Sequence, residues 1–276
     1  METRVFDVSM LWQSLPALLE YLDVTLLVGI SSICLGSLLG GLLAYGKLSR
    51  NPAGRYIAHG YTYIMRCTPS IVLLFIVFYG LPQLAEALFD WEIDDWHRGI
   101  FAVITFTLLF GAYISEVFRA AYEAVDKGQY EAAVSIGLSP WQSVWQVTLP
   151  QAAVIALPNF GNAVINLLKE GALAYTIGLI DLIGKGNLII AQNFGAYGLE
   201  IYLACMLVYW VMTLAIEQGF NKLENYLANG ESVETDTQGN LLEIMRLQGV
   251  ILWSWTGNLW RKHCQRYGQV LVSPWN

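Results

Sequence analysis

Charged residues are scarce in this sequence. Asp, Glu, Lys and Arg together make up 13% of its 276 residues, which is about half of the roughly 25% found in ordinary soluble domains. Residues with hydrophobic side chains make up 55%. A fold with so little charge cannot cover its apolar surface in water, so we expect much of the chain to face a lipid bilayer.

Basic residues are fewer than acidic ones, at 15 against 22, and the formal net charge is −7. No run of Lys and Arg is present that could follow a phosphate backbone, which excludes a nucleic-acid partner. The large apolar fraction also excludes an intrinsically disordered chain.

Cysteine and histidine are sparse as well. The four cysteines share no metal-binding spacing, and none of the three histidines has a second ligand at such a spacing. The sequence also lacks the Gly-x-x-x-x-Gly-Lys-Ser/Thr loop that cradles nucleotide phosphates. We therefore expect no metal site, no bound cofactor and no enzymatic activity in this chain.

Five apolar runs are long enough to cross a bilayer, since about 20 helical residues span about 30 Å of hydrocarbon. They cover residues 24–46, 67–85, 99–115, 147–168 and 201–216. Pro150 and Pro158 interrupt the fourth run, so its first part is expected to be a connector, with the crossing continuing past Lys169. The uncharged segment 186–199 is rich in Gly and amides, and we interpret it as a loop or a short re-entrant piece. The predicted fold is an all-α membrane bundle of about five transmembrane helices.

The charges of the connecting segments predict the orientation, because cytoplasmic loops carry more Lys and Arg. The segment after the first run is purely basic, whereas the loop between the second and third runs holds five acidic residues and one arginine. These loops are expected to be cytoplasmic and external, respectively, which places the N-terminus outside and the C-terminus inside. The predicted parts are an external amphipathic segment (1–22), a transmembrane domain (23–227), and a cytoplasmic linker with a basic aromatic tail (228–276). The tail either lies on the lipid surface or is a poorly ordered appendage.

Two short helices joined by a sharp turn are predicted between the third and fourth runs. Residues 127–136 favour a helix that ends at Gly137, a residue suited to a left-handed C-terminal cap. Ser139 and Gln142 are spaced as a capping box around Pro140, and the second helix is expected to end at Pro150. On physical grounds this loop is either an interfacial cover anchored by tryptophans or a docking surface for a soluble partner.

The same loop resembles the EAA loop of bacterial ABC importer permeases. The similarity lies in Glu131-Ala132-Ala133, in Gly137-Leu138, and in Val147-Thr148-Leu149-Pro150, where Val147 replaces the usual Ile. The run RCTP at residues 66–69 is similar to the Arg-Gly-Thr-Pro signature of the polar amino-acid uptake family, and the overall resemblance covers roughly residues 15–227.

This resemblance implies a permease subunit that carries polar or charged amino acids across the bacterial cytoplasmic membrane. It implies that a separate ATPase subunit, in two copies, binds ATP and Mg and docks on the loop 127–150. It also implies an extracytoplasmic substrate-binding protein and a second permease subunit, identical or related. The residues expected to couple to the ATPase are Glu131, Ala132, Ala133, Gly137, Leu138 and Pro150.

Polar residues inside a membrane span mark a transport pathway by default. Spacings of three, four and three residues place three amides and one ammonium on one face of the fourth helix, with a carboxylate next to them. These candidate pathway residues are Asn159, Asn162, Asn166, Lys169 and Glu170. The alternative is that they join neighbouring helices by hydrogen bonds.

The sequence departs from the family pattern at this point. The usual Lys-Asp-Thr-Ser-Leu is replaced by Lys169-Glu170-Gly171-Ala172-Leu173, so two hydroxyl groups are lost. A permease for another small solute, such as an osmolyte or short peptide, is therefore the first alternative, and an ATP-independent carrier or channel is the second. Glu116 and Arg119 are one helical turn apart, and we expect a local ion pair between them.

Overall fold

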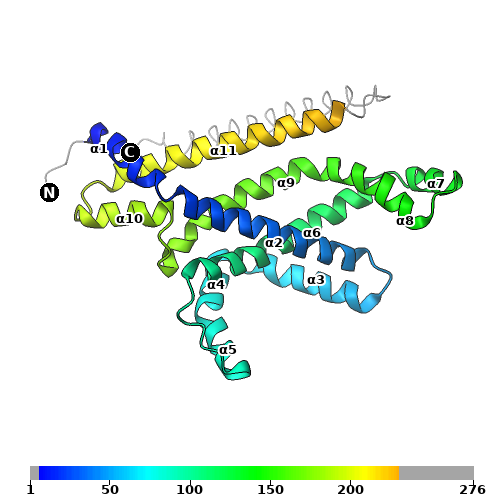
Figure 1. The fold of residues 1–276 in the computed structure, drawn as a ribbon, viewed down its shortest axis with the longest axis horizontal. Helices are drawn as coiled ribbons and strands as arrows, with labels where there is room; N and C mark the ends of the chain where they lie inside the picture. Colours follow the sequence, from blue (N-terminus) through cyan, green and yellow to red (C-terminus); the bar gives the residue numbers. More distant parts are fainter. Residues whose placement is uncertain (1–5, 230–276) are drawn as a thin grey trace, which may run out of the picture. The chain divides into compact units, whose positions relative to one another are not determined.

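The computed structural model describes residues 6–229, and every regular element in that range is a helix. Apart from Ala228 and Asn229, these residues belong to one compact unit, Met1–Leu227 (Figure 1). The α helices are α1 Val8–Leu19, α2 Leu22–Leu48, α3 Pro52–Cys67, α4 Ser70–Phe75, α5 Leu81–Phe89, α6 Arg98–Ala124, α7 Lys127–Ser135, α8 Pro140–Ser143, α9 Leu149–Gly171, α10 Leu182–Gln192 and α11 Gly198–Asn229. Two π turns, η1 Ile76–Gly80 and η2 Val144–Thr148, and one 3-10 helix, η3 Ala172–Ile177, connect some of them.

Five helical stretches within the described range are long and apolar enough to cross a membrane. They are Leu22–Leu48, Ser70–Phe89, Arg98–Ala124, Pro140–Ile177 and Gly198–Leu227. The predicted number of spans and the all-helical fold class are confirmed. Most of the helices extend beyond the apolar runs, because helical hydrogen bonding continues into the polar residues at their ends. The predicted tail lies outside the described residues, apart from its first two.

Helices α2, α6 and α9 form the core of the unit, and α2 and α6 approach each other most closely (Figure 1). Small residues make that approach possible, as is common between membrane helices. A methyl group added at Gly36 would meet the Phe110 ring at 2.8 Å, and one added at Gly40 would collide with the side chain of Ile114. The seam between α2 and α6 therefore depends on these glycines.

Gly40→Val is expected to push α2 away from α6, because the new side chain would occupy the position of Ile114. Overpacking of this kind costs about 1–3 kcal/mol, which should appear as a lower unfolding temperature in detergent. Gly41→Val is the matched control, since nothing lies within 4 Å of the added carbon there. Equal losses in both variants would contradict the close packing of α2 on α6.

Proline does not end the fourth membrane helix. Pro150 follows the π turn η2, as Pro82 follows the π turn η1. Proline lacks an N–H and its ring crowds the carbonyl four residues earlier, and the wider π turn accommodates both effects. The helix therefore runs from Pro140 to Ile177. The expectation that Pro150 stops the second short helix is wrong, and the helix continues past Lys169 as expected.

Two of the segments between the predicted spans contain helices. The basic segment after the first span holds α3, which packs against α2 and α6. Helix α10 occupies Leu182–Gln192, so the loop alternative for residues 186–199 is wrong for the first half of that segment, and the re-entrant alternative stays a prediction. It is held in an apolar cluster with Leu18 of α1 and Ile201 of α11, and this packing outweighs the weak helix propensity of its glycines.

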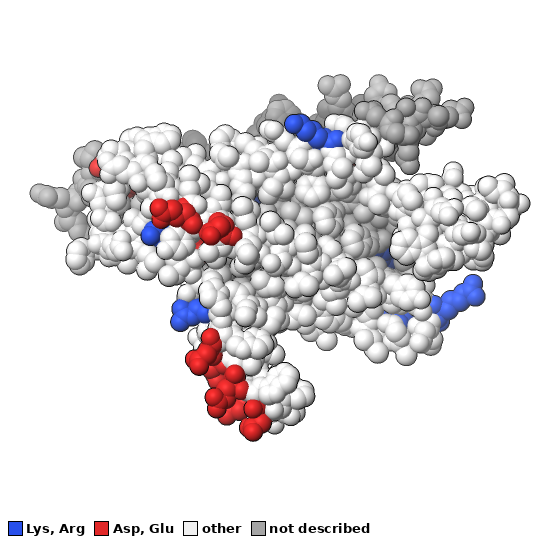
Figure 2. Space-filling view, viewed as in Figure 1, with Lys and Arg blue, Asp and Glu red and all other residues white. Residues whose placement is uncertain are grey.

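The loop between α5 and α6 is strongly acidic at its surface. Figure 2 shows the acidic side chains gathered at the end of α5. The exposed acidic residues of this loop region are Glu86, Asp90, Glu92, Asp94 and Asp95.

Candidate functional site

The first candidate site is the α7–α8 loop, defined here as residues 127–150. Asp126 caps α7 by accepting a hydrogen bond from the Gly128 N–H at 2.6 Å. At the other end Gly137 has φ +101°, its N–H donates to the Val134 carbonyl, and the Leu138 N–H donates to the Ala133 carbonyl. This pair of bonds is a Schellman motif, which requires a left-handed residue. The predicted glycine stop is confirmed.

Helix α8 begins at the predicted capping box. The Gln142 N–H donates to Ser139 Oγ at 3.3 Å, and the Ser139 N–H donates to Gln142 Oε1 at 2.9 Å. Because both ends of the turn between α7 and α8 are fixed by hydrogen bonds, the angle between these helices is built into the loop.

The outer surface of the α7–α8 loop carries large apolar side chains and one carboxylate, Glu131, together with Lys127 and several uncharged polar residues. Trp141 and Trp145 lie with ring centroids 5.3 Å apart and are both exposed, and Ile136 is 82% exposed. Among the predicted coupling residues, those with exposed side chains or backbone are Glu131, Ala132, Gly137 and Pro150, whereas Leu138 is half-buried and Ala133 is buried. Large exposed apolar side chains of this kind are typical of a contact surface.

The second candidate site is a polar cavity of about 440 Å³ between α3, α4, α6 and α9. Of the predicted pathway residues, Asn166, Lys169 and Glu170 line it. Asn159 and Asn162 lie one to two turns earlier on α9, with exposed side chains outside the cavity. The structure therefore places the last three of the five predicted pathway residues around one cavity, and leaves the first two outside it.

Four polar residues of the cavity were not assigned a role from the sequence. Arg66 and Thr68 come from the end of α3, Ser70 begins α4, and Tyr113 comes from α6. Ser70 Oγ donates a hydrogen bond to Glu170 Oε2 at 3.1 Å across 100 residues of sequence. Arg66 and Thr68 belong to the RCTP run, which is visible in the sequence. Nothing in the sequence indicated that this run lies next to α9.

The charges in the polar cavity suit a zwitterion. Arg66 and Lys169 supply two cationic donors, and Glu170 supplies one carboxylate. None of the three belongs to an ion pair among the described residues. Such groups form strong charge-assisted hydrogen bonds with a carboxylate and an ammonium group. The remaining wall is apolar and comes mainly from Met65, Leu109, Phe110 and Leu167.

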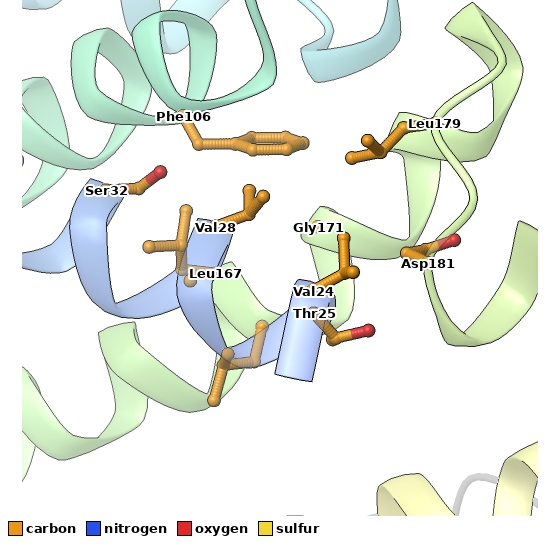
Figure 3. Close-up of a pocket in the computed structure, with 11 residues that line it drawn as sticks. Val24, Thr25, Val28, Ser32, Phe106, Leu167, Gly171, Leu179 and Asp181 are labelled. Atoms are coloured by element: carbon orange, nitrogen blue, oxygen red, sulfur yellow. The ribbon is translucent and has the colours of Figure 1, made fainter. Parts of the chain in front are cut away.

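A small void of about 10 Å³ lies deeper, between α2, α6, α9 and the start of α10 (Figure 3). It has room for about one water molecule. Asp181 at its edge is 2% exposed, and its Oδ1 accepts a hydrogen bond from the Gly184 N–H at 2.7 Å. Thr25 Oγ1 accepts from the Leu182 N–H at 3.2 Å. Burial raises the pKa of Asp181 to about 6, and the backbone hydrogen bonds oppose this shift only in part.

Asp181→Asn is expected to stabilise the protein at pH 7.5. The folded protein holds the Asp181 proton up to about pH 6, whereas an unfolded chain releases it near pH 3.9. The parent therefore loses stability as the pH rises from about 4 to 6, and above that range the loss is constant at roughly 3 kcal/mol. Asn keeps the helix cap without this penalty. The variant should unfold at a higher temperature than the parent at pH 7.5, and the difference should be much smaller at pH 4.5. An equal difference at both pH values would contradict the prediction.

Comparison with known proteins gives one consistent result. Residues 33–224 match the family described as "Binding-protein-dependent transport system inner membrane component". The chain is 38% identical over 231 residues to the L-cystine transport system permease protein TcyL of Bacillus subtilis, covering 83% of this chain and 95% of that protein. It is 32% identical over 219 residues to the glutamine transport system permease protein GlnP of Escherichia coli, covering 79% and 96%.

Solved structures give the same fold. A chain from an amino acid ABC transporter crystallised with histidines superposes with a TM-score of 0.71 at 30% identity, covering 81% of this chain and all of that one. The MetNI methionine ABC transporter in an inward facing conformation gives a TM-score of 0.57 at 18% identity, covering 79% and 98%, which bears on the fold alone.

Proposed function

Because the chain belongs to the family of binding-protein-dependent transport system inner membrane components, we propose that its substrate is a polar or charged amino acid. It is a multi-pass permease subunit of an ABC importer in the inner membrane, and ATP hydrolysis belongs to a separate subunit. The observation that carries the substrate class is the polar cavity, where two cations and one carboxylate line the same space.

The recognition of an amino acid follows from the chemistry of that cavity. Arg66 and Lys169 bind the α-carboxylate, and Glu170 binds the α-ammonium group in place of Ser70. Asn166 and Tyr113 offer further hydrogen bonds. The cavity volume of about 440 Å³ is within the range of roughly 300–1,000 Å³ that is common for small-molecule sites. A neutral osmolyte or sugar would leave these charges unpaired, which is unfavourable in a membrane interior.

The two named relatives support this substrate class, since one is named for L-cystine and the other for glutamine. The test is uptake by proteoliposomes that contain the permease, its ATPase and its binding protein. ATP-dependent accumulation of radiolabelled L-cystine or L-glutamine is the expected result. Accumulation of an osmolyte or a short peptide, with neither amino acid taken up, would favour the alternative substrate classes.

The α7–α8 loop is the proposed docking site of the ATPase. Its exposed tryptophans, Ile136 and Glu131 form a contact surface whose angle is set by the Schellman motif and the capping box. Two ATPase copies and an extracytoplasmic binding protein complete the assembly. A second permease subunit, identical or related, supplies the other wall of the pathway, because five helices cannot easily enclose one.

The proposed orientation places the N-terminus outside and the C-terminus inside, because the acidic loop between α5 and α6 contrasts with the segment after α2, which holds Arg50 and Arg55. A reporter fused at Asp94 should be active only on the external side. The matched fusion at Arg55 should be active only in the cytoplasm. A cytoplasmic signal at Asp94 would contradict the proposed topology.

A further inference from the structure

A buried lysine lies at the end of α2. The Lys47 side chain is 0% exposed, although Leu48 alone follows it in the helix. A lysine so close to a helix end usually extends its ammonium group into water. Here Lys47 Nζ instead donates to Ser115 Oγ at 2.6 Å and to Glu116 Oε1 at 2.9 Å, both on α6.

The ion pair continues along α6 toward the α7–α8 loop. Arg119 donates to Glu116 Oε2 through Nε at 2.9 Å, which confirms the expected local pair, and it contacts Glu123 through Nη1 at 2.6 Å. Helix α6 ends one residue after Glu123, and Asp126 then caps α7. Charged contacts therefore extend from the end of α2 along α6 to Glu123, near the end of α6.

The same cluster contacts α3, the helix that leads to the polar cavity. Thr62 Oγ1 lies 3.4 Å from Ser115 Oγ, so the hydroxyls of α3 and α6 meet beside the Lys47 ammonium. Arg66, one turn after Thr62, lines the cavity, and so does Tyr113, two residues before Ser115. The buried charge thus lies between the cavity and the α7–α8 loop.

We propose that Lys47 is a positioning residue of the transport cycle, because its ammonium group fixes the α2–α3 hairpin to the end of α6 that leads into the α7–α8 loop. The inference rests on the proposed coupling of this loop to an ATPase. A buried cation is tolerated only with its partners in place. The α2–α3 hairpin and α6 must therefore move together when the α7–α8 loop moves. The cavity residues on α3 and α6 then change position when the ATPase moves the loop.

The test compares Lys47→Met, Glu116→Gln and the double variant in the reconstituted complex of permease, ATPase and binding protein. Lys222→Met is the control, because Lys222 is an exposed lysine on α11. The measured quantity is radiolabelled L-cystine or L-glutamine transported per ATP hydrolysed, together with the unfolding temperature. Lys47→Met is expected to lower this ratio about fivefold or more, which corresponds to a modest coupling between sites.

The double variant is expected to fall no further than the worse single variant, since both changes remove the same contact. The double variant also removes both charges of the Lys47–Glu116 pair, so neither is left unpaired. It is therefore the variant to measure if Lys47→Met alone fails to assemble. A parental ratio in Lys47→Met or in the double variant would overturn the proposal, whatever the change in unfolding temperature. A purely structural role predicts the parental ratio of substrate transported per ATP hydrolysed, together with a lower unfolding temperature.

A distance measurement separates this proposal from the proposed function. Spin labels at Arg50 and Gln129, in a chain without its native cysteines, report on the end of α2 and on α7. Lys47→Met should broaden the distance distribution between them, and an unchanged distribution would overturn the positioning role even in a chain that transports nothing. Failure of the parent complex to move any polar or charged amino acid would instead contradict the proposed substrate class.

Discussion

Glu131→Lys should abolish transport while the protein inserts in the membrane at normal levels. Glu131 is exposed on α7, beside the apolar surface of the α7–α8 loop, and has no ion-pair partner among the described residues. On a merely solvated helix face this reversal costs less than about 0.5 kcal/mol. At a docked interface it places a cation in a site that accepts a carboxylate, and the expected cost is several kcal/mol.

The measurements are ATP-driven uptake and co-purification of the ATPase. A transport loss of at least about a hundredfold corresponds to roughly 3 kcal/mol. Glu217→Lys is the matched control, because Glu217 is an exposed acidic residue on α11, away from the loop. Transport by Glu131→Lys at the parental rate would show that the α7–α8 loop only covers the bundle.

Lys169→Met should raise the KM for amino-acid uptake about tenfold to a hundredfold, since a hydrogen bond to a charged group contributes about 1.5–3 kcal/mol. Lys169 lines the polar cavity with Arg66 and Glu170. Methionine keeps the length and the apolar stem of the side chain, so the variant removes the charge with little change in packing.

Initial uptake rates over a range of substrate concentrations separate KM from the maximal rate. Lys222→Met again serves as the control for loss of a lysine at an exposed position. If the alternative is correct and Lys169 only joins α9 to neighbouring helices, the variant should lower the unfolding temperature and leave the KM unchanged.

Locally encoded features were predictable from the sequence. The spans follow from apolar length, and the turn between α7 and α8 follows from Gly137 and the Ser139 capping box, because each depends on one continuous stretch of the sequence. The Glu116–Arg119 pair follows from helical spacing in the same way.

Features that depend on distant contacts were not predictable. From the sequence, Lys47 is one of several basic residues that follow the first span. Its burial depends on Ser115 of α6, 68 residues later, and could not be predicted. The polar cavity depends on a turn at Thr68 and Pro69 that brings the start of α4 to the end of α9. The π turn before Pro150 replaced the expected helix end, because propensity rules describe the cost of a proline but not the wider turn that removes it.

The unbroken helix from Pro140 to Ile177 has a mechanical consequence. Its first turn belongs to the α7–α8 loop, and Glu170, which lines the polar cavity, lies 30 residues further along. At 1.5 Å per residue, about 45 Å of continuous helix, measured along its axis, separates the two points. A tilt of about 5° about its loop end moves the other end by about 4 Å, more than the length of a hydrogen bond. If the α7–α8 loop docks on an ATPase as proposed, this continuous helix would transmit a rotation of the loop to the Ser70–Glu170 contact.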